Sequence, residues 1–104
     1  MHPSKQPILL IAEKLQVDQI SKDQTDQEQY EHLAKYLDHL VANDFNKLIS
    51  ILYRIDVSED KAKKALAEDA NTISPGHTLA RLLIEREIEK IKFREKYSSK
   101  SSEK

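Results

Sequence analysis

The sequence predicts an all-α fold, a small bundle of four or five helices, and three observations support this class. A single glycine, Gly76, and three prolines leave little of the turn chemistry that hairpin-rich β proteins need. Apolar residues recur three or four positions apart along most of the chain, which is the helical period. Polar stretches at residues 21–29 and 69–78 separate these periodic segments, as connections between helices do.

The first helix is expected over residues 6–20, with Ser4 as a candidate cap and Pro7 tolerated in the first turn. Ile8, Ile11, Ala12 and Leu15 share one face, while Leu9, Leu10, Val17 and Ile20 gather on the other side. A helix that is apolar on two sides is buried between neighbours or continues into an interface. A short strand across residues 7–12 is the alternative.

The second helix is expected over residues 26–42, where Thr25 and Glu28 have the spacing of a capping box. A third helix follows over residues 44–55, after a cap at Asn43 or Asp44. Its apolar stripe is wide enough to contact two other helices at once, so we expect it at the centre of the bundle. The stripe consists of Phe45, Leu48, Ile49, Ile51, Leu52 and Ile55.

A short fourth helix is expected over residues 57–68, capped either by Asp56 together with Glu59 or by Ser58. The last helix is expected over residues 75–97, with Ser74 as the cap and Pro75 at the first helical position. Residues 1–97 then form one helical domain, and the polar tail 98–104 is expected to be disordered because it has no apolar residue.

Two apolar stripes run along this last helix, which is about 35 Å long at about 1.5 Å per residue. One stripe consists of Ala80, Ile84, Ile88 and Ile91, and the other consists of Leu79, Leu82, Leu83, Phe93 and Tyr97. One should face the core, and the other should face the first helix or a second copy of the chain. We therefore predict self-association, with a dimer favoured; the alternative is that both stripes are internal. The predicted interface residues are Leu79, Leu82, Leu83, Arg86, Lys90, Phe93, Arg94 and Tyr97.

Composition argues against several function classes. The absence of cysteine excludes disulfides, thiolate zinc sites and cysteine nucleophiles. The longest apolar run, residues 8–12, is far shorter than the roughly 18 residues that would suggest a membrane span. The N-terminus also lacks the long apolar stretch and cleavage site of a secretory signal. We expect a cytoplasmic protein that does not contact membranes.

Candidate chemical sites have simpler explanations. His32 and His39 lie seven residues apart, a rise of about 10.5 Å, which is too far for one metal ion to bind both. His77 beside Ser74 suits capping of a helix better than hydrolysis. Carboxylates alternate with basic residues on the last helix and are expected to be solvated and ion-paired; they are Glu85, Glu87 and Glu89. We identify no catalytic, cofactor-binding or metal-binding residue and no small-molecule substrate, and we expect no enzymatic activity.

Charge is unevenly distributed, although the whole chain has a net charge of −1. Residues 90–104 have a net charge of +4, with Phe93 and Tyr97 among the basic residues, as in surfaces that stack nucleobases. Binding of RNA or DNA by this segment is therefore the alternative function. Residues 18–44 have a net charge of −5, so the two segments could meet within one copy or between copies.

Two runs, "NDFNKLISILYRIDVSEDKAKKAL" and "SPGHTLARLLIEREIEKIKFR", also suggest a family. Over residues 43–97 the chain resembles a group of short, all-helical bacterial proteins of unassigned function. The similarity rests on the "ILYRIDVSE" junction and the last helix, neither of which is a chemical motif. The resemblance implies a helical protein and brings no catalytic residues.

Overall fold

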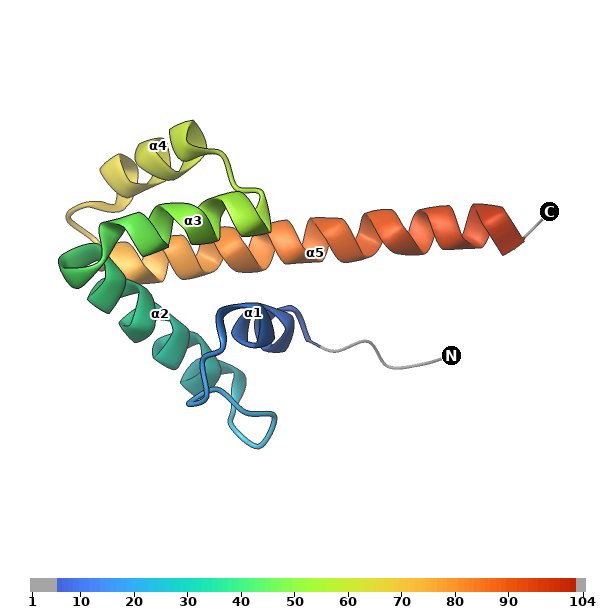
Figure 1. The fold of residues 1–104 in the computed structure, drawn as a ribbon, viewed down its shortest axis with the longest axis horizontal. Coiled ribbons are helices and arrows are strands. Elements are labelled where there is room, and N and C mark those ends of the chain that lie inside the picture. Colours follow the sequence, from blue (N-terminus) through green and yellow to red (C-terminus); the bar gives the residue numbers. More distant parts are fainter. Residues whose placement is uncertain (1–5, 103–104) are drawn as a thin grey trace.

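The computed structural model describes the backbone of residues 6–102 and the side chains of residues 6–96. Within that range it contains helices and no strand, so the predicted all-α bundle with a long C-terminal helix is confirmed, and the strand alternative for residues 7–12 is excluded. The helices are α1 (Pro7–Leu15), α2 (Asp26–Asn43), α3 (Phe45–Ile55), α4 (Glu59–Asp69) and α5 (Pro75–Ser102) (Figure 1).

The helix at the centre of the arrangement is α5. It contacts all four other helices and packs most extensively against α2. Figure 1 shows α3 and α4 on one side of α5, with α1 and α2 on the other. The sequence predicts residues 44–55 at the centre. The α3 helix does bury Leu48, Ile51, Leu52 and Ile55 and contacts both α2 and α5, but it is α5 that contacts every other helix. With 28 residues and a length of about 42 Å, α5 alone is long enough to reach every neighbour.

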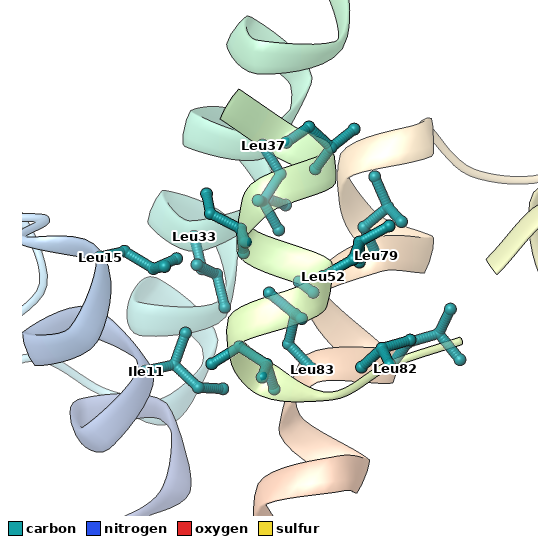
Figure 2. Close-up of a cluster of buried hydrophobic side chains, with 14 of the residues drawn as sticks. Ile11, Leu15, Leu33, Leu37, Leu52, Leu79, Leu82 and Leu83 are labelled. Atoms are coloured by element: carbon teal, nitrogen blue, oxygen red, sulfur yellow. The ribbon is translucent and has the colours of Figure 1, made fainter. Parts of the chain in front are cut away.

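The core lies where α1, α2 and α3 converge on the first half of α5. Buried leucine and isoleucine side chains from all four helices meet there, and each removes apolar surface from water. Figure 2 shows Ile11 and Leu15 of α1, Leu33 and Leu37 of α2, Leu52 of α3, and Leu79, Leu82 and Leu83 of α5.

The first helix is shorter than predicted. It ends at Leu15 instead of residue 20, because Gln16 adopts the left-handed conformation with φ of 59° and its N–H bonds back to the helix. Val17 and Ile20 are nevertheless buried, so they reach the core from the connection that follows. Because α1 packs on α5, and its Ile8 lines one hollow together with Ile84 and Ile88, the stripe that contains Ile84 and Ile88 faces the first helix within one chain.

The starts of α2, α3 and α4 follow predicted caps. The structure begins α1 after Gln6 with no side-chain cap, and the candidate cap Ser4 lies outside the described residues. Thr25 and Glu28 form the capping box of α2, and the Asp44 carboxylate accepts a hydrogen bond from the backbone of α3. Of the two alternatives for α4, Ser58 is the cap, and the helix begins at Glu59 instead of residue 57. Asp56 instead ends α3 in the left-handed conformation, with φ of 70°.

A close approach joins α2 to the start of α5. The Asp38 carboxylate accepts hydrogen bonds from the Gly76 N–H at 2.6 Å and from the Ser74 hydroxyl at 2.8 Å. Ser74 also caps α5, as predicted, because its oxygen accepts from the His77 N–H at 3.3 Å. A Cβ atom on Gly76 would overlap the Ala34 carbonyl oxygen and come within 2.8 Å of the Asp38 nitrogen. Only glycine therefore allows the two helices to pack this closely.

The second half of α5 extends past the other helices (Figure 1). It continues to Ser102, beyond the predicted end at residue 97. The predicted disorder of the tail 98–104 falls on residues whose side chains are not described, and residues 103–104 lie outside the described chain altogether, so it stays a prediction.

Candidate interaction surface

Residues 92–102 of α5, here called the projecting segment, are the most distinctive surface feature. The described side chains of this segment, Lys92 to Lys96, are all exposed, and Phe93 retains 59% of its accessible surface. A helical stretch of this length is only marginally stable in water without tertiary contacts. Because aromatic residues are enriched among the side chains that anchor interfaces, Phe93 makes this helix a candidate surface for a partner.

Three of the predicted interface residues do not lie on this surface. Leu79, Leu82 and Leu83 retain 1%, 3% and 0% of their accessible surface and form part of the core (Figure 2). They fix the first half of α5 in the bundle, so they are not available as anchors for a second copy. The described interface residues that remain outside the core are Arg86, Lys90, Phe93 and Arg94; the side chain of Tyr97 lies outside the described ones.

Arg86 ties the base of the projecting segment to the end of α3. Its guanidinium donates to the Asp56 carboxylate at 2.9 Å and to the Asp56 carbonyl oxygen at 3.1 Å. A further bond at 3.0 Å joins it to Glu89 on the same helix. The hydrogen bond to Asp56, followed by the one to Glu89, raises the pKa of Arg86. The Arg86 guanidinium therefore holds α5 against α3, and most of its hydrogen-bonding capacity is used within the chain.

Glu87 corrects the expectation that the carboxylates of this helix are solvated. Glu85 and Glu89 are exposed and paired with Arg81 and Arg86, but Glu87 is fully buried. One of its oxygens lies 2.7 Å from the Lys14 ammonium of α1 and 3.8 Å from Lys90. The other oxygen has no hydrogen-bond partner among the described residues.

Lys90 lies between the buried carboxylate and the surface. Burial, and next the nearby charge of Lys14, lower the pKa of the Lys90 amine. The pair Lys14–Glu87 joins residues 73 positions apart in the sequence, so no local pattern could have revealed it. Lys90 accordingly belongs to the contact between α1 and α5 more than to a surface that is free to bind a partner.

A second surface feature lies at the junction of α3 and α4, close to Asp56 and therefore to the base of the projecting segment. It is a hollow of about 290 Å³, which we call the acidic hollow. The side chain of Tyr53 at its edge retains 74% of its accessible surface. The lining residues include three carboxylates and no basic residue. They are Leu52, Tyr53, Asp56, Val57, Ser58, Glu59 and Asp60.

The histidines of α2 line a different hollow, of about 370 Å³, together with Gln19, Lys35 and Tyr36. The amide of Asn43 donates to the backbone of His39 at 3.0 Å and lies 3.1 Å from its ring. Nδ1 of His32 is buried without a hydrogen-bond partner in the described structure. No three His, Cys, Asp or Glu side chains among the described residues converge on a point that could hold a metal ion.

His77 belongs to a row of polar groups that resembles a nucleophile with its base. Its Nδ1 lies 2.7 Å from the Ser74 oxygen, and its Nε2 lies 2.8 Å from Glu31. The Ser74 hydroxyl, however, gives its proton to Asp38 and accepts from the backbone of α5. The row therefore fastens α5 to α2, which is the capping role expected from the sequence, with Glu31 and Asp38 added by the fold.

Comparison of the chain with protein families, with curated protein sequences and with solved structures found no match. The resemblance to short, all-helical bacterial proteins accordingly stays a prediction. Among the residues that the structure describes, no helix has the length and apolar character needed to cross a bilayer.

Proposed function

We propose that this protein is a non-enzymatic protein–protein interaction module that associates with a second copy of itself through the projecting segment of α5. The observation that carries the proposal is the contrast between the two halves of this helix. The first half is packed into the core, while the second half extends beyond the bundle (Figure 1), and its described side chains, Phe93 among them, are exposed. Burial of such an aromatic side chain is the main gain that a helical interface offers.

The distribution of charge supports a second copy as the partner. Residues 90–104 have a net charge of +4, while the chain as a whole has a net charge of −1, so the remainder is acidic. Among the described residues, no ion pair joins residues 92–96 to the acidic stretch 18–44. The basic segment of one copy can therefore meet acidic groups of another, and a two-fold axis would form both contacts at once.

Light scattering over a range of protein concentrations tests the proposal. The wild-type chain should reach a mass of about 24 kDa, twice its 12.0 kDa, while Phe93→Ala should remain at the mass of one chain at the same concentrations. Phe45→Ala is the matched control, because Phe45 is similarly exposed, at 56%, but begins α3 at the end away from Asp56 and the projecting segment. A wild-type protein that stays monomeric at high micromolar concentration contradicts the proposal.

Binding of RNA or DNA is the second candidate function. It is favoured by the exposed Lys92, Arg94 and Lys96, which flank Phe93 on the same segment. Phosphate contacts would make such binding strongly salt-dependent. A filter-binding assay with single-stranded RNA and DNA tests it, and no retention at about 50 mM salt would exclude it.

A further inference from the structure

We propose that the acidic hollow of one copy receives the projecting segment of a second copy, with Phe93 packed against Tyr53 and with Arg94 and Lys96 facing Glu59 and Asp60. This inference rests on the proposed self-association and names the surface that the projecting segment binds. The partner of the hollow is thus a basic helix with an aromatic anchor, supplied by the same chain.

The hollow has the chemistry that such a helix requires. Leu52 and Val57 give it an apolar floor, and Tyr53 at its edge is the most exposed of the large hydrophobic side chains described. Aromatic pairs gain about 0.5–1.5 kcal/mol beyond the area that they bury. Of the three carboxylates, Asp56 is paired with Arg86, whereas Glu59 and Asp60 form no ion pair among the described residues. Two uncompensated negative charges therefore lie beside an exposed aromatic ring.

The projecting segment presents the complementary pattern. Phe93 has Arg94 and Lys96 one and three positions after it, so on a helix their side chains lie on either side of the aromatic ring. These three residues are all exposed. With a basic side chain on each side of it, Phe93 can pack on the apolar residues of the hollow while Arg94 and Lys96 face the carboxylates at its rim.

The hollow cannot be filled by the segment of its own copy. Arg86 holds α5 at the edge of the hollow through Asp56. Phe93 follows seven residues later on one continuous helix, about 10.5 Å further along its axis and away from the bundle. A second copy in the antiparallel orientation brings its own segment back across this end. Because each hollow lies at the base of a projecting segment, both contacts form together in a closed dimer.

The acidic stretch 18–44 is the competing surface, and part of its charge is used within the chain. Asp38 accepts from Gly76 and Ser74, Glu31 contacts His77, and Asp44 caps α3. None of the large hydrophobic side chains with high exposure belongs to this stretch. Asp18, Asp23 and Asp26 form no ion pair among the described residues, so this stretch does offer negative charge. It lacks, however, the exposed aromatic side chain that the acidic hollow provides.

A pair of charge-swapped variants tests the inference. The first reverses the rim, Glu59→Lys with Asp60→Lys, and the second reverses the segment, Arg94→Glu with Lys96→Glu. Each variant alone should dissociate at least about tenfold more readily than wild type, because like charges then face each other. An equimolar mixture should form a heterodimer, because both of its contacts join opposite charges.

Two further variants control for folding and for general charge effects. Glu59 and Asp60 lie in the first turn of α4, so circular dichroism should establish that the rim variant folds. Tyr53→Ala removes an exposed side chain without touching the core, and should also weaken the dimer at least about tenfold. Asp18→Lys with Asp23→Lys makes the same change in charge on an exposed connection and should leave association unchanged.

The outcomes separate this inference from the proposed function. Recovery of the dimer only in the mixture supports the inference. If both swapped variants remain dimeric while Phe93→Ala is monomeric, self-association stands and the acidic hollow is not its binding surface. If the Asp18 and Asp23 variant dissociates and the rim variant does not, the segment binds the 18–44 stretch and the inference is wrong. A monomeric wild-type chain overturns both proposals.

Discussion

Gly76 provides a sharp test of the packing between α2 and α5. Helix propensity alone predicts that Gly76→Ala is stabilising, by up to about 1 kcal/mol, because alanine restricts the unfolded chain. The structure predicts the opposite sign, because the added Cβ would overlap the Ala34 carbonyl oxygen and crowd the Asp38 nitrogen. Both are backbone atoms of a helix, so they cannot move aside as a flexible side chain would.

The expected loss of stability in Gly76→Ala follows from the packing and the hydrogen bond that the added methyl group disturbs. Overpacking of this kind costs about 1–3 kcal/mol. Moving α5 away from α2 also weakens the bond from the Gly76 N–H to the Asp38 carboxylate, and a hydrogen bond to a charged group contributes about 1.5–3 kcal/mol. After subtracting the propensity gain, we expect a net loss of about 2–4 kcal/mol, a large share of the roughly 5–15 kcal/mol typical of a domain.

Urea unfolding followed by circular dichroism measures this loss directly. Asp38→Ala is the matched control, since it removes the hydrogen bonds to Gly76 and Ser74 while leaving the close approach intact. We expect it to be destabilising as well, by about 1.5–3 kcal/mol for each hydrogen bond to the carboxylate that it removes. An alanine variant that is as stable as wild type would refute the argument that this contact requires glycine.

Two further predictions concern the charged groups around α5. Lys14→Met leaves the buried Glu87 with only the more distant Lys90, so the free energy of unfolding in urea should fall by about 2–3 kcal/mol. Adding Glu87→Leu should recover most of that loss, and no recovery would contradict a desolvation penalty at this position. Hydrogen bonds from Thr78 and then Arg81 lower the pKa of Asp69. Its stabilising contribution is therefore complete above the ordinary value of 3.8 and is lost as the pH falls through the lower folded value. Asp69→Asn should weaken the acid dependence of the unfolding midpoint below pH 3.8, and an unchanged acid limb would contradict this.

The sequence predicts the helices and most of their starts because these depend on local patterns. The capping box at Thr25 and the cap at Ser74 each involve residues within three positions of one another. The early end of α1 was missed because Gln16, and not glycine, adopts the left-handed conformation there. Nothing in the composition of that stretch indicates a stop.

The candidate site could be predicted only in part, because its features depend on tertiary packing. Periodicity identified two apolar faces on the last helix but could not say that Leu79, Leu82 and Leu83 are covered by the chain itself. The local pattern predicts a surface position for Glu87, because its partner, Lys14, lies on another helix. The acidic hollow likewise forms only when α3 and α4 meet at Asp56, where two helix ends bring Tyr53 next to Glu59 and Asp60.

A spin label tests most directly whether a second copy holds the projecting segment. The chain has no cysteine, so Lys92→Cys can be labelled at a single position. The spin-labelled chain carries no nitrogen-15 and is mixed with wild-type chain that is enriched in nitrogen-15. Only signals of the wild-type chain are then observed, so any broadening arises between copies. If the acidic hollow holds the segment, amide signals from Tyr53 to Asp60 of the wild-type copy broaden selectively. Uniformly sharp signals there, at a concentration where the wild-type chain is dimeric, would contradict it.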